Sequence, residues 1–383
     1  MKKILSKYLA FVICAVVAWF GGMGFAFFQL GGFNRLNMKL HEIDQYVRGA
    51  YLGKIDEKSL FKCAVNGYID GLGDKYAKYY TSEEWKKWED FNSGVISGIG
   101  ISLSTNDKGE LIVVSVYPNS PAAAAGIQAG DVIVKVDEIE ITKSNISKLL
   151  KGEVGSEVSL TINRNGDVFA RTLVRENVEI PSVEYFMDGE NGYVKIDVFT
   201  DSSARQFEEA LLNLQSKGAR ALIFDVRNNG GGTISSVCKM LNMLIPSGII
   251  ATQVDLNGHE SVLGISDENE INLPMVVVTN ENTASAAELF VCDLKDYGKA
   301  RQVGKKTYGK GVLQTTKMLG DGGAIKVTTA YFNPAKSENF NEVGVIPDID
   351  VDLSEDKEKL YLNSKLNLCD DDQYQAALKL LQN

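Results

Sequence analysis

The sequence predicts a multidomain α/β protein, and three observations carry that prediction. Residues 176–355 alternate buried strands with amphipathic helices, which is the order expected of an α/β core. Residues 93–175 instead read as short strands separated by glycine- and proline-containing turns, typical of a small β domain. Residues 8–30 are nearly all apolar and long enough to form a membrane-spanning helix.

Changes in composition divide the 383 residues into five segments. They are a cytoplasmic tip with a transmembrane anchor (1–30), an N-terminal helical arm (31–92), the inserted β domain (93–175), the α/β core (176–355) and a C-terminal helical tail (356–383). The tail is charged and then helical over residues 374–381, and we expect it to pack on the core without chemistry of its own.

The N-terminal stretch is predicted to be an uncleaved anchor. Three lysines precede it, and at about 1.5 Å per residue it covers a hydrocarbon core of roughly 30 Å. The positive-inside rule then places the N-terminus in the cytoplasm and everything after Leu30 outside the cell membrane. A cleaved signal peptide would have a shorter apolar region and a small-residue cleavage site. A buried core helix would carry a polar face, which this stretch lacks.

Charge and reactive residues exclude several classes of function. A formal net charge of -10, with no lysine- or arginine-rich run, argues against nucleic acid binding. The five cysteines include no CxxC pair, so neither a zinc ribbon nor thioredoxin chemistry is expected, and we expect buried, reduced thiols. The chain has only two histidines, and neither His41 nor His259 lies in a hydrolase-like motif. No metal and no cofactor are predicted.

Residues 31–92 have helical periodicity. Apolar residues from Leu36 to Val47 recur at helical spacing. A second helix is expected to begin at Ser59, a candidate N-cap, and a third at Thr81, which begins a Thr-x-x-Glu capping pattern. We expect a packing or dimerisation arm, and no site there.

The β domain resembles a PDZ domain. Residues 120–133, Ser-Pro-Ala-Ala-Ala-Ala-Gly-Ile-Gln-Ala-Gly-Asp-Val-Ile, are very similar to the signature of PDZ domains in proteases. The loop Gly98, Ile99, Gly100 and Ile101 matches the one whose amides bind the terminal carboxylate of a peptide. Glycines let amides converge on an anion, and a strand edge pairs with an extended peptide. The alternative is a small β domain in which Gly98 and Gly100 only ease a turn.

Two turns of the core carry the candidate chemistry. One buried strand, 221–226, runs into Arg227-Asn-Asn-Gly-Gly-Gly, and another, 273–279, leads to Ser285 at the start of a helix. A serine hydroxyl needs a base. Lys310, flanked by glycines, qualifies if burial lowers its pKa. Gln314 is placed to orient the amine, and the glycine run with the Ala286 amide offers oxyanion donors. Taken singly, Ser285 is a helix cap and Lys310 a solvated charge; the combination predicts a Ser-Lys hydrolase.

Rival motifs are weaker. Residues 304–310 fit seven places of a phosphate-binding loop, but Gly311 stands where a Ser or Thr should hold magnesium. The glycines at 98 and 100 do not complete a dinucleotide fingerprint. Cys292 lies on the same helix as Ser285 and is better explained by core packing.

Together these motifs resemble the carboxy-terminal processing proteases, also called tail-specific proteases, from about residue 40 to the C-terminus. The matching segments are Leu72-Gly-Asp-Lys-Tyr-Ala-Lys-Tyr-Tyr-Thr before the PDZ domain, Phe224-Asp-Val-Arg-Asn-Asn-Gly-Gly-Gly, Thr283-Ala-Ser-Ala-Ala-Glu, Gly309-Lys-Gly-x-x-Gln, and Val343-Gly-Val-Ile-Pro-Asp-Ile as a closing strand. Ala287 and Gly230 depart from a common serine and a common proline. The resemblance implies a core related to the ClpP and crotonase-like architecture.

By the same resemblance Ser285 is the nucleophile, Lys310 the base and Gln314 the residue that positions the lysine. Gly231 and Ala286 match the oxyanion amides, Gly231 less securely because three glycines run together. The implied activity is endopeptidase cleavage of secreted or membrane proteins near free C-termini, with the PDZ domain binding the substrate tail and gating the site. The arm is compatible with a homodimer, and a latent resting site with an activating partner. The rivals are an inactive PDZ scaffold and a crotonase-like acyl-CoA enzyme, which the lack of a nucleotide-binding pattern disfavours.

Overall fold

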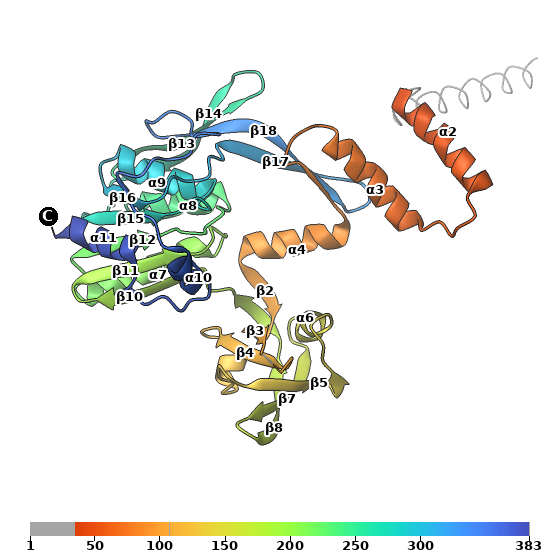
Figure 1. Ribbon diagram of the computed structural model, residues 1–383, viewed down its shortest axis with the longest axis horizontal. Coiled ribbons are helices and arrows are strands. Elements are labelled where there is room, and N and C mark those ends of the chain that lie inside the picture. The colour runs from red at the N-terminus through yellow and green to blue at the C-terminus, as the bar shows by residue number, and fades with distance from the viewer. Residues whose placement is uncertain (1–34, 107, 383) are drawn as a thin grey trace, which may run out of the picture. The chain divides into compact units, whose positions relative to one another are not determined.

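The computed structural model describes residues 35–106 and 108–382, which form two compact units that divide at Gly67. The predicted anchor, residues 8–30, and Cys14 lie outside the described residues. Within those residues, no helix has the length and apolar content needed to cross a membrane. Figure 1 shows the elements of both units and labels most of them.

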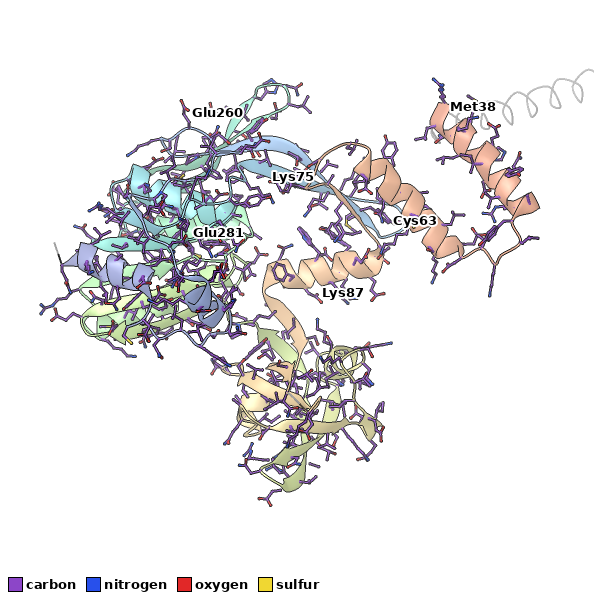
Figure 2. All side chains as sticks on the ribbon, viewed as in Figure 1. Met38, Cys63, Lys75, Lys87, Glu260 and Glu281 are labelled. Carbon is purple, nitrogen blue, oxygen red and sulfur yellow. The ribbon has the colours of Figure 1, made fainter. Side chains whose placement is uncertain are left out.

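The first unit contains two helices, α2 (Arg35–Ala50) and most of α3 (Glu57–Asp70). The N-cap expected at Ser59 is wrong, because α3 begins two residues earlier. Asp56 supplies the cap instead, since its carboxylate accepts hydrogen bonds from the Lys58 and Ser59 amides at 3.1 and 3.3 Å. The expected burial of thiols is also wrong for Cys63, labelled on α3 in Figure 2, and for Cys369; both are exposed, whereas Cys238 and Cys292 are buried.

The second unit begins with β1 (Lys78–Tyr80) and α4 (Ser82–Ser93), whose Thr81 cap is confirmed. Thr81 accepts a hydrogen bond from the Glu84 amide, and the Glu84 carboxylate accepts one from the Thr81 amide. A two-stranded ribbon then pairs β2 (Val95–Gly98) with β9 (Glu176–Glu179). Because the ribbon joins the two ends of the intervening segment, the chain leaves and re-enters the core at one place.

Between the ribbon strands lies a small β domain with the order β3-β4-β5-β7-β8 and β6 paired to β5. Its elements are β3 (Ile101–Thr105), β4 (Leu111–Val116), α5 (Pro121–Ala124), β5 (Val132–Val136), β6 (Ile139–Glu140), α6 (Ile146–Leu150), β7 (Glu157–Arg164) and β8 (Asp167–Val174). Alternate residues of β7, Val158, Leu160 and Ile162, are fully buried in its core. This domain therefore has its own hydrophobic core.

The α/β core is built on a six-stranded sheet in the order β10-β11-β12-β15-β16-β19, parallel from β11 onward. The strands are β10 (Val183–Asp188), β11 (Asn191–Ile196), β12 (Ala221–Asp225), β15 (Met275–Thr279), β16 (Ala300–Gly304) and β19 (Ile349–Asp350). The closing strand expected over 343–349 is wrong in extent: it pairs only at Ile349–Asp350. Pro347, which has no N–H to donate, precedes it.

Helices cover both faces of this sheet. One face packs against α7 (Ser203–Ser216), α8 (Ile234–Asn242) and α9 (Ala286–Asp296); the other packs against α11 (Asp372–Leu381), which follows α10 (Glu355–Leu362). Side chains alternate between the two faces along a strand. On β12, Leu222 and Phe224 therefore pack on the face covered by α7, α8 and α9, and Ile223 packs on the face covered by α11. Every residue of β12 is buried, as expected for a central parallel strand.

A second, antiparallel sheet was not predicted. It has the order β1-β18-β13-β14 with β17 paired to β18, and consists, besides β1, of β13 (Gly248–Asp255), β14 (Glu260–Ser266), β17 (Val312–Met318) and β18 (Ala324–Pro334). β1 pairs with β18 from Lys78 opposite Lys326 to Tyr80 opposite Ala324. Residues just before the β domain therefore lie beside the strands that follow Lys310.

Candidate active site

Two turns interlock at the carboxyl edge of the parallel sheet. β12 and β15 are neighbours, so the turns that follow them leave the sheet side by side. The Thr283 hydroxyl donates to the Val226 carbonyl at 2.8 Å, and the Ala284 amide to the Asn229 carbonyl at 2.9 Å. These bonds hold the turn that ends in Ser285 against the glycine run.

Ser285 has an uncommon backbone conformation, with φ at 59°. Positive φ costs a residue other than glycine about 1–3 kcal/mol, and such residues cluster at functional sites. α9 begins directly after it, so the first helical amides lie next to the serine. Within the described residues the Ala286 amide has no hydrogen-bond partner, which leaves it available for an anion beside the hydroxyl.

A buried carboxylate ties the serine to the lysine. Glu288 is fully buried, and its Oε2 accepts hydrogen bonds from the amides of Ser285 and Lys310, both at 2.8 Å. Its Oε1 accepts from the Thr307 hydroxyl and the Gly309 amide, both at 2.6 Å. The backbones of the candidate nucleophile and base therefore meet at one oxygen atom. Sequence reasoning gave Glu288 no role, although the Ser-x-x-Glu spacing of a capping box marks it.

The Lys310 amine is partly buried and lies over the Tyr76 ring, 4.5 Å from its centroid. Burial lowers the pKa of Lys310, and the charge of Lys326 lowers it further, while Asp74 and Glu288 act in the opposite direction. Lowering the lysine pKa is what general-base chemistry requires. In the part of the chain that the structure describes, no hydrogen bond joins the amine to the Ser285 hydroxyl.

Gln314, on β17, binds β17 itself and the neighbouring β18 rather than the lysine. Its Nε2 donates to the Val312 carbonyl at 3.2 Å and to the Thr328 hydroxyl at 3.3 Å; no bond to Lys310 occurs among the described residues. Thr328 in turn donates from its amide and its hydroxyl to the Asp74 carboxylate, at 2.9 and 3.1 Å. The residues around Asp74 thus form a wall of the site, which sequence reasoning did not anticipate.

Gly231 lies directly against the serine. A Cβ at this position would be 2.8 Å from the Ser285 Cβ and 3.0 Å from the Ala286 nitrogen, and its φ of 101° also favours glycine. Its amide donates to the Asn229 side chain at 2.8 Å. The amide of the neighbouring Gly230 has no partner within the described residues. The structure therefore brings the glycine run, Ser285 and Ala286 together.

The predicted carboxylate loop lies between β2 and β3. The carbonyls of Ile99 and Gly100 accept the amides of Ala122 and Tyr117, both at 2.9 Å, whereas the Ile99 and Gly100 amides have no partner within the described residues. Beside this loop is a groove of about 270 Å³. It is lined mainly by apolar side chains: Ile96, Ile99, Ile101, Leu103, Ile146 and Leu150. Free amides at the end of an apolar groove suit the C-terminus of an extended peptide.

No group of three or more His, Cys, Asp or Glu side chains among residues 35–106 and 108–382 is arranged to hold a metal ion.

Comparison with known proteins identifies both domains. Residues 190–351 match peptidase family S41, and residues 97–172 match the PDZ domain family. The carboxy-terminal processing protease CtpA of Bacillus subtilis (strain 168) is 30% identical over 381 residues, covering 95% of this chain and 81% of that protein. A protein of Staphylococcus aureus (strain COL) named as a probable CtpA-like serine protease is 31% identical over 336 residues, covering 85% of this chain and 67% of that protein.

A solved structure titled as a putative S41 protease from Bacteroides fragilis NCTC 9343 shares the fold, with a TM-score of 0.52 at 20% identity, covering 87% of this chain and 91% of that one. The match to CtpA assigns the chain to a family and not only to a fold, because the sequence identity is 30% and extends over 95% of this chain. The chain belongs to the carboxy-terminal processing proteases of peptidase family S41, and it is a serine-type C-terminal processing peptidase with a PDZ domain.

Proposed function

We propose that Ser285 and Lys310 form the catalytic dyad of this peptidase. The observation that carries the proposal is the single Glu288 oxygen that accepts both the Ser285 and the Lys310 amide. This oxygen holds the backbones of Ser285 and Lys310 close together in any conformation of their side chains. The lowered pKa of Lys310, caused first by burial, supports its role as a base.

The proposed reaction begins with attack of the Ser285 hydroxyl oxygen on the scissile carbonyl, while the neutral Lys310 amine takes the hydroxyl proton. For this the amine leaves the Tyr76 ring and turns toward Ser285, where Gln314 orients it. The Ala286 and Gly231 amides stabilise the oxyanion, the Gly231 amide after releasing the Asn229 side chain. The lysine then returns the proton to the departing amine, and a water molecule hydrolyses the acyl-enzyme with the same base.

We propose that the PDZ groove binds the substrate's C-terminal carboxylate through the amides of the Gly98–Ile101 loop and gates the site. The free Ile99 and Gly100 amides and the apolar lining support substrates with apolar C-termini.

We further propose that residues 8–30 anchor the chain in the cell membrane with the protease outside, and that its substrates are secreted or membrane proteins.

A homodimer through the first unit is also proposed. Leu40, Ile43 and Phe61 are 45, 51 and 55% exposed on its two helices, and apolar groups spaced along helices favour association. A Phe61→Glu change should halve the molecular mass measured by light scattering in detergent. An unchanged mass would contradict a dimer through this surface. We also propose that the resting site is latent and that a partner activates it. The position of the Lys310 amine over the Tyr76 ring supports this, because the amine must turn toward Ser285 before it can act as a base.

The decisive experiment compares cleavage of an unfolded protein with an apolar C-terminus by the full chain in detergent, by Ser285→Ala and by Lys310→Ala. Matched controls are Ser235→Ala and Lys305→Ala, which alter the same residue types away from the dyad. We expect activity to be lost in the first pair and kept in the second. Activity that survives in Lys310→Ala would overturn the dyad, and binding without cleavage by the unmutated chain would favour a PDZ scaffold.

A further inference from the structure

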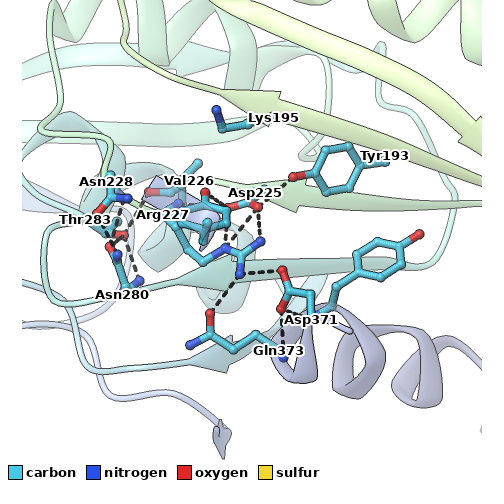
Figure 3. A network of polar contacts seen from close by, with 12 residues as sticks. Tyr193, Lys195, Asp225, Val226, Arg227, Asn228, Asn280, Thr283, Asp371 and Gln373 are labelled. Atoms are coloured by element: carbon cyan, nitrogen blue, oxygen red, sulfur yellow. Dashed lines mark hydrogen bonds and ion pairs between the residues drawn. The ribbon is translucent and has the colours of Figure 1, made fainter. Parts of the chain in front are cut away.

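The C-terminal helix reaches the active-site turn through one buried arginine. Arg227 Nη1 forms an ion pair with the Asp371 carboxylate at 2.8 Å and donates to the Gln373 side-chain oxygen at 3.0 Å. All three residues are at most 2% exposed. Figure 3 shows this network, in which the start of α11 lies against the strand that leads to the glycine run.

Asp225 of the core and Tyr361 of α10 contact the rest of the guanidinium. Arg227 Nε donates to both oxygens of Asp225 at 2.9 and 3.0 Å, and the Tyr361 ring lies 4.1 Å from the guanidinium carbon. Tyr193 donates its hydroxyl proton to Asp225 at 2.7 Å. Burial alone would lower the pKa of Arg227, but the charge and hydrogen bonds of Asp225 outweigh it and hold the pKa well above its usual range. The arginine is therefore charged, and its place is set by its partners.

From Arg227 the chain passes through only three residues to Gly231. The Arg227 amide donates to the Asp225 carboxylate at 3.0 Å, and the Asn229 amide to the Val226 carbonyl at 3.2 Å. The turn is short and closed by these bonds, so a shift of the arginine backbone is carried to the glycine run. Gly231 has no room for a Cβ beside Ser285, so this part of the turn is closely packed against the serine.

We propose that Asp371, with Gln373, is a positioning residue for peptide cleavage: it fixes the Arg227 guanidinium and, through it, the turn that presents the Gly231 amide to the oxyanion. This rests on the proposed function, in which that amide stabilises the transition state. A misplacement of about 1 Å in such a donor is enough to slow catalysis about 100-fold.

Docking of the tail can be separated from this positioning. Tyr374 and Ala377 of α11 pack against Ile223, Val276 and Val303 on the sheet, and the Tyr374 hydroxyl donates to Asp188 at 2.6 Å. Neither contact involves Arg227. Asp371 also caps α11 through its Oδ1, whereas the ion pair uses Oδ2. An Asp371→Asn change keeps a cap acceptor but turns an NH₂ group toward the arginine.

The experiment compares the full chain with Asp371→Asn and Gln373→Ala, and with Tyr374→Phe as the control that loosens the same helix elsewhere. We expect Asp371→Asn to lower kcat by about 10- to 100-fold with KM within about twofold. Tyr374→Phe should leave kcat unchanged, even if it lowers Tm as much as Asp371→Asn does. Hydrogen exchange at residues 228–232 should rise in Asp371→Asn and not in the control.

An unchanged kcat in Asp371→Asn, or equal losses of kcat in Asp371→Asn and Tyr374→Phe, would overturn the proposal. If Asp371→Asn fails to fold, Gln373→Ala decides, since it removes one neutral acceptor and should lower kcat with KM constant. Ser285→Ala is assayed in parallel. Activity in that variant would refute the proposed dyad itself, and the inference with it, whereas its loss leaves only the role of Asp371 to be judged.

Discussion

Lys310 faces two environments that act on its pKa in opposite directions. Burial favours the neutral amine, which is the form that accepts a proton, whereas the electron-rich face of Tyr76 favours the ammonium. Activity is therefore expected to rise with pH through a lysine pKa below its usual range. A flat profile from about pH 5 to 9 would contradict a lysine base.

Replacing the aromatic ring should move that rise. Tyr76→Leu keeps an apolar neighbour but removes the stabilisation of the cation, so the pKa of Lys310 falls further and activity appears at lower pH. A cation–π contact of about 0.5–1.5 kcal/mol corresponds to a shift of roughly 0.5–1 pH unit. Tyr76→Phe keeps the ring and should leave the profile in place. The measurement is kcat against pH, and a shift in the Phe variant equal to that in the Leu variant would assign the effect to the hydroxyl.

Glu288 is expected to be indispensable although it does not touch the reacting atoms. Glu288→Gln replaces one carboxylate oxygen with a donor, so at least one of the amides it now binds must face an NH₂ group. Leaving a buried amide unpaired costs about 1–3 kcal/mol, and we expect kcat to fall at least about tenfold. Glu281→Gln, an exposed glutamate on the same turn, should retain activity. Comparable activity in the two variants would count against a positioning role for Glu288.

Helix α9 has a second buried acid, and its effect on stability depends on pH. Asp293 accepts the Ala335 amide at 2.9 Å through Oδ1, while its Oδ2 is buried without a partner within the described residues. Burial raises the pKa of Asp293 well above the ordinary carboxyl value. The folded state then binds more protons than the unfolded state, so this group makes the protein less stable as pH rises above the unfolded pKa.

Asp293→Asn removes the ionisable carboxyl and keeps the acceptor for Ala335. We expect its Tm to exceed that of the unmutated chain at pH 7, with the difference shrinking toward pH 4, where the unfolded carboxyl also becomes protonated. Glu208→Gln, an exposed change on α7, should show no such trend. Thermal unfolding followed by circular dichroism measures both, and a variant less stable at pH 7 would refute the cost assigned to the buried charge.

Across the molecule, the PDZ groove and the peptidase site should be coupled through the substrate's own C-terminus. Amidating that terminus removes the charge that the Ile99 and Gly100 amides would bind. Hydrogen bonds to a charged group contribute about 1.5–3 kcal/mol, so we expect kcat/KM to fall roughly 10- to 100-fold. Acetylating the N-terminus of the same substrate is the matched control. Equal rates for acid and amide would show that the groove does not read the carboxylate.

Much of the fold could be predicted from local pattern. The buried strands β12 and β15 lie where strands were expected, at 221–226 and 273–279, because apolar runs between glycine-rich turns mark central parallel strands. The predictions that failed concern features whose sequence pattern is weak or whose partner residues lie far away in the sequence. Asp56 displaced Ser59 as a cap. In the antiparallel sheet, β18 pairs with β1 and β13, which lie far away in the sequence, so no local pattern predicts these pairings.

For the candidate site too, some features could be predicted from local sequence and others could not. The identities and spacings of Ser285, Lys310, Gln314 and the glycine run were legible because covalent neighbours specify turns and helix starts. The partners that hold them were not: Asp74 binds Thr328 at a distance of 254 positions, and Arg227 binds Gln373 at 146. Such contacts form only when sheets and helices pack, and no local periodicity encodes them. The sequence alone therefore determined the identities and spacings of the candidate site residues, because these depend on covalent neighbours. Only the tertiary structure decided which distant residues hold them, because those contacts form through long-range packing.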